Sequence, residues 1–289
     1  MSVIRSFLRY CVLQWRKEFQ QFLWKRQAAQ ALASFCPKGQ SIDASLHNNK
    51  KVLILCPHAD DEWIGCSRII INKNSDCHVL YYKMYGYNQT NENKAIRDEE
   101  IKQCAEKWDF RLLDSVQNTL EFLTISIQER RYDMFFIPSP IDWHWEHRDV
   151  FCDFVNAANR VGCLNDIGVF YYYISVPCVQ SKNVYYAELT KLQQKSKWFY
   201  FEQSYRSQVM PVQRYKLQEK IQHPSSSVFA AETYCRVSLD KLNFDKMRLS
   251  CNLFVQRLNS LKKIINNIYK VRKVVQLLDN ITYVHERED

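Results

Sequence analysis

Glycine and proline are scarce in this chain: its 289 residues include only five glycines and seven prolines. Long flexible linkers are usually rich in such residues, so the composition argues against a string of small domains. A chain of this length can instead bury one large core, with smaller appendages.

Paired cysteines and long apolar runs are missing as well. The 11 cysteines are scattered and none stands in a Cys-x-x-Cys pair, which favours reduced thiols and a cytoplasmic protein over a disulfide framework. Within residues 3–29, no uncharged run approaches the ~18 residues that a membrane-spanning helix needs. Nor is there an apolar segment followed by a small-residue cleavage site, as in a signal peptide.

The formal charge of +9 is concentrated at the two ends. Residues 1–40 hold seven Lys and Arg against one acid, and residues 241–289 hold ten against five. Residues 41–240 have 23 bases and 25 acids, so this part lacks the basic cleft of a nucleic-acid enzyme. We expect no nucleic-acid partner.

Both basic ends have apolar residues at helical spacing. The N-terminal helix is interpreted as packed on the domain, with an interfacial helix on the inner, anionic face of a membrane as the alternative. The predicted division is an N-terminal helix and connector (1–48), a main domain (49–240) and a C-terminal helical segment (241–289). The last segment would pack on the domain, on a partner or on a membrane.

Strand and helix patterns alternate along the middle of the chain. The sequence predicts strands at 52–56, 78–84, 111–113, 134–137 and 169–175, and helices at 61–73, 94–108, 119–131, 149–160 and 188–201. This alternation predicts an α/β fold with a parallel sheet.

Two clusters of ionisable residues follow buried strands. His58 to Glu62, directly after the first strand, presents one imidazole and three carboxylates, which must be paired, solvated or bound to a metal. Asp142 to His147 follows the strand at 134–137. If these strands are near neighbours, the clusters converge at the carboxyl edge of the sheet, where α/β proteins place their sites. Two histidines and one aspartate suit a catalytic zinc ion with an open fourth position, and also Fe²⁺ or another divalent ion.

The remaining groups suit hydrolysis. Asp60 could take a proton from water at the open position. Whichever of His144 and His147 is not a ligand could donate to an oxyanion, and Asp142 could fix the tautomer of the His144 ring. An acidic helix N-terminus or a phosphate-receiving domain would also explain the acids, but neither explains His58 and the second cluster.

The two clusters resemble the motifs of the LmbE-like, or PIG-L-type, zinc-dependent de-N-acetylases. That family has a His-Pro-Asp-Asp-Glu loop after its first strand and a distal Asp-x-His-x-x-His segment, which stand here at 58–62 and 142–147, with Ala59 in place of the proline. Weaker similarities span about 50–235: Gly65, Gly86, Arg97, Glu100, Tyr205-x-Ser207-Gln208 and Ala231-Glu232-x-Tyr234.

The resemblance implies a Rossmann-like three-layer α/β fold with a mostly parallel sheet, to which this chain adds amphipathic helices at both ends. It implies zinc held by His58, Asp61 and His147. It also implies Asp60 as the base, and His144 as the group that stabilises the oxyanion or protonates the leaving amine.

The substrate implied is an N-acetylated sugar or glycoconjugate of the N-acetylglucosamine type, in cell-surface glycan or glycolipid biosynthesis. Arg97 falls where the family tends to have a substrate-binding arginine, with a solvated helix arginine as the alternative. Trp63, Trp143 and Trp145 would suit stacking on a sugar ring or a place in the core. Alternative functions are hydrolysis of an N-formyl or other amide, and a non-catalytic protein that binds partners through its terminal helices.

Overall fold

The computed structural model describes residues 49–237 apart from short gaps, together with 39–41 and the isolated residues Trp15, Phe19 and Phe22. The gaps are 73, 87–88, 141, 143, 163–166, 175–177, 179–183, 209–211, 224 and 226. The predicted terminal helices therefore lie outside the described residues, except that Trp15, Phe19 and Phe22 are helical and exposed.

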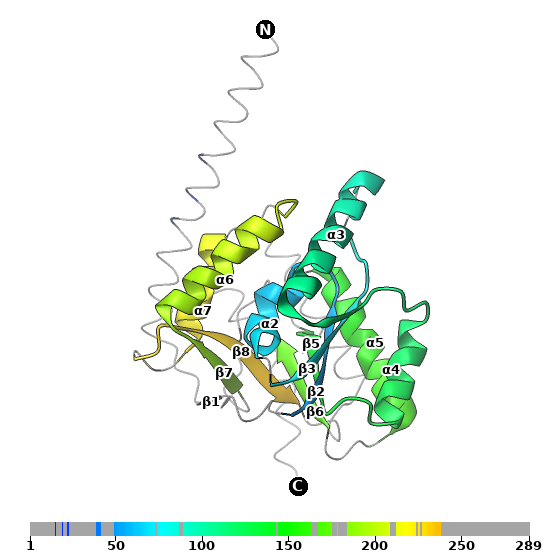
Figure 1. The fold of residues 1–289 in the computed structure, drawn as a ribbon. Helices are drawn as coiled ribbons and strands as arrows, with labels where there is room; N and C mark the ends of the chain where they lie inside the picture. Colours follow the sequence, from blue (N-terminus) through cyan, green and yellow to red (C-terminus); the bar gives the residue numbers. More distant parts are fainter. Residues whose placement is uncertain are drawn as a thin grey trace.

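One mixed sheet runs through the described part of the chain (Figure 1). Its strands are β1 (Gly39–Ser41), β2 (Lys51–Cys56), β3 (Asp76–Tyr81), β4 (Arg111–Leu113), β5 (Met134–Pro138), β6 (Gly168–Tyr172), β7 (Val184–Leu189) and β8 (Ala230–Val237). They lie in the order β1-β7-β8-β6-β5-β2-β3-β4. Every neighbouring pair is parallel except those of β8, which is antiparallel to both β6 and β7. The predicted α/β class with a mostly parallel sheet is confirmed.

Helices cover both faces of the sheet. They are α2 (Asp61–Ile71), α3 (Asn91–Trp108), α4 (Thr119–Gln128), α5 (Trp145–Val161), α6 (Lys191–Ser204) and α7 (Val212–Gln222). In β2, Val52 and Ile54 pack with α2, α3, α6 and α7, whereas Leu53 and Leu55 pack with α4 and α5 on the other face. Alternate side chains of one buried strand thus enter two cores, which gives three layers. None of the described helices is both long and apolar enough to cross a membrane.

Several element boundaries differ from those expected. The helix expected at 188–201 begins only at Lys191, because Thr190 caps it in a reciprocal pair of bonds with Gln193, and β7 precedes it. Helix α5 begins at Trp145 instead of 149, which places His147 in its first turn. Strand β8, helix α7 and strand β1 inside the expected connector were not predicted.

Gly65 allows α2 to lie close to the sheet. A Cβ atom at this position would lie 2.5 Å from Cδ2 of Tyr172 and 3.2 Å from Cδ1 of Ile174. The Tyr172 ring is fully buried, and its hydroxyl donates to the carbonyl of Leu55 at 2.7 Å, so it cannot swing away. The glycine therefore sets the distance between β6 and the helix that follows His58.

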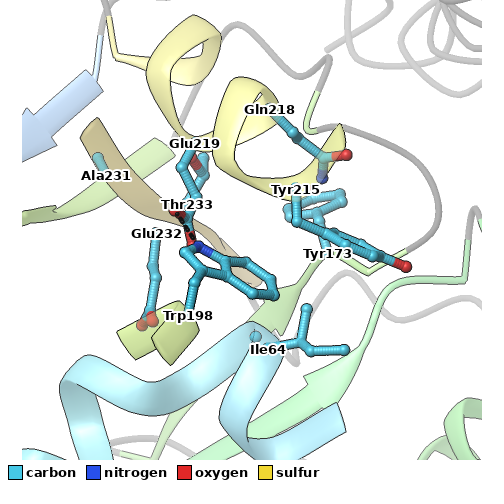
Figure 2. A pocket seen from close by; sticks show the side chains of 10 residues that line it. Ile64, Tyr173, Trp198, Tyr215, Gln218, Glu219, Ala231, Glu232 and Thr233 are labelled. Carbon is cyan, nitrogen blue, oxygen red and sulfur yellow. Dashed lines mark hydrogen bonds between the residues drawn. The ribbon is translucent and has the colours of Figure 1, made fainter. Parts of the chain in front are cut away.

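A buried lysine ties α2 to three other elements. Nζ of Lys197 in α6 lies 2.8 Å from Oε1 of Glu219 in α7 and 2.6 Å from Oε1 of Glu232 in β8, and donates to the carbonyl of Ile64 at 2.7 Å. Burial lowers the pKa of this lysine, but the two carboxylates outweigh it and the pKa is raised. Glu219, Glu232 and Trp198 line a cavity of about 20 Å³. Figure 2 shows these side chains. Losing the ammonium would leave two unpaired buried carboxylates, which costs about 3–5 kcal/mol.

We expect Gly65→Ala to lower the free energy of unfolding by about 1–3 kcal/mol, because the added methyl group overpacks the Tyr172 ring. This loss should appear even though alanine favours a helix over glycine by about 1 kcal/mol. Urea unfolding of the variant and the parent measures the difference. The control is Glu106→Ala at an exposed position of α3, which should stay within about 0.5 kcal/mol of the parent. A Gly65→Ala protein as stable as the parent would contradict this account of the packing.

Candidate active site

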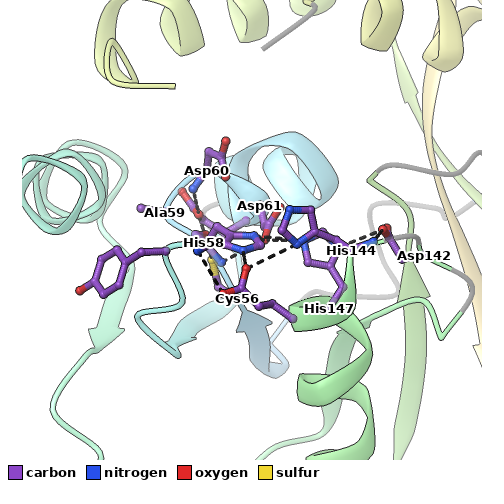
Figure 3. Close-up of polar contacts among 12 residues, drawn as sticks. Cys56, His58, Ala59, Asp60, Asp61, Asp142, His144 and His147 are labelled. Carbon is purple, nitrogen blue, oxygen red and sulfur yellow. Dashed lines mark hydrogen bonds and ion pairs between the residues drawn. The ribbon is translucent and has the colours of Figure 1, made fainter. Parts of the chain in front are cut away.

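The two ionisable clusters meet at one edge of the sheet. Strands β2 and β5 are parallel neighbours, with Ile54 opposite Phe136, so both chains leave the sheet at the same edge. As a result, His58 and His147 come into contact although they lie 89 residues apart in the sequence. Figure 3 shows the side chains gathered above the end of β2. The sequence-based expectation that the clusters converge agrees with this geometry.

Three donor atoms form a nearly regular triangle. His58 Nδ1 lies 3.0 Å from Asp61 Oδ2 and 3.1 Å from His147 Nε2, and His147 Nε2 lies 3.2 Å from Asp61 Oδ2. Ligand atoms around a tetrahedral zinc ion, with bonds of about 2.0–2.1 Å, lie about 3.3 Å apart. The spacing and chemistry of the three donors therefore fit one divalent ion. Ring nitrogens of His58, His144 and His147 also lie within 4.8 Å of one another, which makes His144 a further possible donor.

Three carboxylates surround the two imidazole rings of the triangle. Asp61 contacts both rings, while Glu146 Oε2 lies 2.6 Å from His58 Nε2 and Asp142 Oδ2 lies 3.1 Å from His147 Nδ1. Burial lowers the pKa of both rings, but Asp61 and the other carboxylates outweigh it, raising the pKa of His58 to about 9 and that of His147 as well. The carboxylates thus attract positive charge to this point, which a divalent ion would supply once the rings are neutral.

The outer carboxylates also fix how the rings point. Glu146 and Asp142 hold the ring nitrogens that face away from Asp61, which leaves the other nitrogen of each ring for an ion. The sequence-based prediction places Asp142 beside the ring of His144. In the structure its Oδ2 lies 3.1 Å from Nδ1 of His147, and its Oδ1 accepts from the backbone N–H of His144 at 2.8 Å. The reason is that α5 begins earlier than expected and turns His147 inward. Sequence reasoning did not assign Glu146, although a carboxylate between two histidines was a signal.

Asp60 and His144 lie beside the triangle. The Asp60 carboxylate is buried and accepts no hydrogen bond from any described residue, and burial and Asp61 raise its pKa well above the usual range. Figure 3 shows its side chain above the imidazole rings. The His144 side chain is 42% exposed, and its ring meets that of His58 edge-on at 4.7 Å between centroids. Burial and the neighbouring rings lower the pKa of His144. One carboxylate and one imidazole are thus placed next to the candidate ion position.

Glu62 holds the loop that carries these groups. This fully buried carboxylate accepts from the backbone N–H of Asp60 at 3.1 Å, from Cys56 Sγ at 3.2 Å and from the hydroxyl of Tyr205. Burial raises the pKa of Glu62 to about 7. Asp60 has a φ of 149°, a backbone conformation that non-glycine residues rarely adopt and that surrounding bonds must maintain. Glu62 supplies such a bond, a role that the motif alone did not show.

The chain after β3 forms another wall of the site. The N–H of Gly86, which has a φ of +73°, donates to Glu146 Oε1 at 3.0 Å. Arg97 Nη1 donates to the carbonyl of Tyr85 at 3.2 Å, and its positive charge partly opposes the rise in the pKa of Asp60. Arg97 is therefore a partly buried residue beside the site, and not a solvated helix arginine.

The structure describes two of the three tryptophans considered for sugar stacking. Trp63 is fully buried and packs on the rings of Trp108 and Tyr200, with centroids 5.1 and 4.6 Å away, so it belongs to the core. Trp145 begins α5 and is 38% exposed. Trp143 lies outside the described residues. Of the two that the structure describes, Trp145 is the accessible one.

Fold and site together define an α/β protein with a candidate metal centre at the carboxyl edge of its sheet. No protein-family model matches the chain, and no curated protein sequence matches it. Among solved structures, it is similar to the N,N'-diacetylchitobiose deacetylase from Pyrococcus horikoshii in complex with an inhibitor. That match has a TM-score of 0.51 and 19% identity, and covers 66% of this chain and 84% of the deacetylase.

Two further solved structures are similar over a comparable part of the chain. The conserved protein TT1542 from Thermus thermophilus has a TM-score of 0.49 and 20% identity, over 64% of this chain and 94% of its own. A deacetylase of the teicoplanin biosynthetic pathway has a TM-score of 0.47 and 10% identity, over 65% and 98%. At such identities the Pyrococcus match shows a shared fold. The resemblance to LmbE-like de-N-acetylases is confirmed at that level.

We expect the parent protein to bind about one zinc ion per chain. The His147→Ala variant should bind little zinc, because it keeps only two of the three protein ligands. Elemental analysis after zinc loading and desalting measures this. His223→Ala is the matched control, since the ring of His223 packs on Tyr186 of β7 and takes no part in the triangle. Equal zinc content in His147→Ala and His223→Ala would exclude the triangle as the ion site.

Proposed function

We propose that this protein is a divalent-metal-dependent amide hydrolase that removes the acetyl group from an N-acetylated sugar or glycoconjugate. The proposal rests on the triangle of His58, Asp61 and His147. Beside it lie the Asp60 carboxylate, which accepts no hydrogen bond from a described residue, and the half-exposed imidazole of His144. The fold shared with a solved diacetylchitobiose deacetylase supports an N-acetylated sugar as the substrate.

Zinc is the proposed ion. Two imidazoles and one carboxylate, with a fourth position open, are the donors of many catalytic zinc sites, and Fe²⁺ is the next candidate. Bound there, the ion would polarise the amide carbonyl and lower the pKa of water. Glu146 and Asp142 keep Nδ1 of His58 and Nε2 of His147 directed at Asp61, so the site is already arranged for binding.

Two residues move protons in the proposed reaction. Asp60 accepts a proton from the water that attacks the amide carbonyl, because its buried carboxylate accepts no hydrogen bond from any described residue. His144 donates to the carbonyl oxygen as this becomes negative, and then protonates the departing nitrogen. The products are acetate and a free amine. Arg97, at the wall of the site, contacts the substrate.

The decisive test is Asp60→Asn with zinc loaded. Asparagine keeps the size of the side chain but cannot accept the proton, so acetate release should fall about 10²–10⁴-fold. Zinc content should stay at the level of the parent, because Asp60 takes no part in the triangle. Acetate released from N-acetylglucosamine and N-acetylglucosamine oligomers measures turnover.

Glu121→Gln, at an exposed position of α4, is the control and should keep full turnover. A zinc-loaded Asp60→Asn protein that releases acetate as fast as this control would contradict the role of Asp60. Absence of turnover by the zinc-loaded parent on every N-acetylated sugar in the panel would contradict the proposed function. It would favour a non-catalytic protein that retained the fold.

The acyl group is tested in the same panel, because an N-formyl sugar presents the same carbonyl to the site. A faster reaction with the N-formyl compound would change the substrate and leave the residue roles in place. Contact of the basic ends with a membrane or partner, and with it a lipid-linked substrate in glycan biosynthesis, stays a prediction from the sequence.

A further inference from the structure

A groove lies between α3 and the C-terminal end of α6. This groove has a volume of about 640 Å³, within the range of about 300–1,000 Å³ that small-molecule sites occupy. Its lining includes the polar and apolar side chains of Glu92, Ile96, Glu99, Gln103, Gln203 and Arg206. None of these residues has a role in the proposed reaction.

Two consecutive residues, Ser207 and Gln208, connect the groove to the loop at 58–62. Both carboxylate oxygens of Glu100, a buried residue that lines the groove, hold Ser207, through its N–H at 2.8 Å and its hydroxyl at 2.5 Å. The next residue, Gln208, donates from Nε2 to the carbonyl of Ala59 at 3.2 Å. Ala59 stands between His58 and Asp60. These bonds place the groove next to the loop that carries His58 and Asp60.

The lining suits a polyhydroxylated ring. Carboxylates and amides accept from hydroxyl groups, and guanidinium and amide N–H groups donate to them. The guanidinium of Arg206 is held by the carbonyl of Gln203 at 3.0 Å, and Gln103 donates to Glu99 at 2.9 Å, so these groups are already positioned. Ile96 is 43% exposed among them and offers an apolar contact for the C–H face of a sugar.

The charge of the groove restricts the class of glycan that it can bind. Three carboxylates, those of Glu92, Glu99 and Glu100, line the groove against one cation, Arg206. Such an excess of negative charge repels glycans that carry phosphate, sulfate or carboxylate groups and attracts amino groups.

We propose that this groove binds the sugar residues next to the N-acetylated one, in a glycan that is neutral or carries free amines. The inference rests on the proposed function for its place in a reaction, and it makes the substrate an oligosaccharide. A monosaccharide fills only the site above the triangle, whereas a trimer also contacts the groove.

The test compares kcat/KM for N-acetylglucosamine and its β-1,4-linked trimer, with zinc-loaded full-length protein. The parent should prefer the trimer by at least about tenfold, and Glu99→Gln/Arg206→Ala should reduce this preference by about tenfold, because charge-assisted bonds to hydroxyl groups are lost. The ratio of the two substrates cancels losses that affect both. Glu106→Gln/Arg160→Ala, which changes the same charges at exposed positions outside the groove, should keep the preference of the parent.

A binding measurement separates this inference from the proposed function. Calorimetry with the glucosamine trimer, which has no acetyl group to lose, should show about tenfold weaker binding to the groove variant than to the control variant. Binding of that kind without turnover of any N-acetylated sugar would sink the proposed function and keep the groove. Turnover at equal kcat/KM for monomer and trimer, or trimer binding that is absent or equal in both variants, would overturn the groove and leave the proposed function standing.

Discussion

Three buried carboxylates share two imidazole rings where β2 and β5 leave the sheet, and the rest of the site depends on this pairing of charge. Buried ions are costly unless they are paired and hydrogen bonded. Asp61, Glu146 and Asp142 are each paired with His58 or His147, or with both. The same bonds that neutralise the charge also turn one nitrogen of each ring toward Asp61. The same contacts therefore set both the charge balance of the site and the direction of its donor atoms.

Residues far from the two motifs hold this arrangement in place. The segment that follows α6 supplies Tyr205, whose hydroxyl donates to Glu62, and Gln208, which donates to the backbone carbonyl of Ala59. Gly86 holds Glu146 from the chain after β3. Glu232 of β8 accepts from Ser67 of α2 and pairs with Lys197. The weak sequence similarities outside the motifs thus fall on residues that brace the helix and loop next to the triangle.

Much of this site could be predicted from the sequence, because two apolar strands each ran into histidine and aspartate within a few residues. Parallel strands bring their carboxyl ends to one edge, so only their adjacency had to be assumed, and β2 does pair with β5. The ring partner of Asp142 could not be read in the same way. It depends on the residue at which α5 begins. The helix begins at Trp145, four residues before the predicted start at 149.

Strands β7 and β8 were missed for a physical reason. Their side chains are largely buried on both faces, so no alternation of polar and apolar residues marks them. The burial of Lys197 could not be predicted either. A lysine on a helix is usually exposed to solvent, yet Lys197 is 2% exposed because Glu219 and Glu232, which are distant in sequence, pair with it in the folded protein. Contacts of this kind exist only once the tertiary structure has formed.

Anomalous diffraction at the zinc edge, from crystals of the zinc-loaded protein, tests the central claim most directly. The account predicts one ion bound by Nδ1 of His58, Nε2 of His147 and a carboxylate oxygen of Asp61, with a position left open toward Asp60 and His144. An ion held without Asp61, or an anomalous peak away from this triangle, would contradict it.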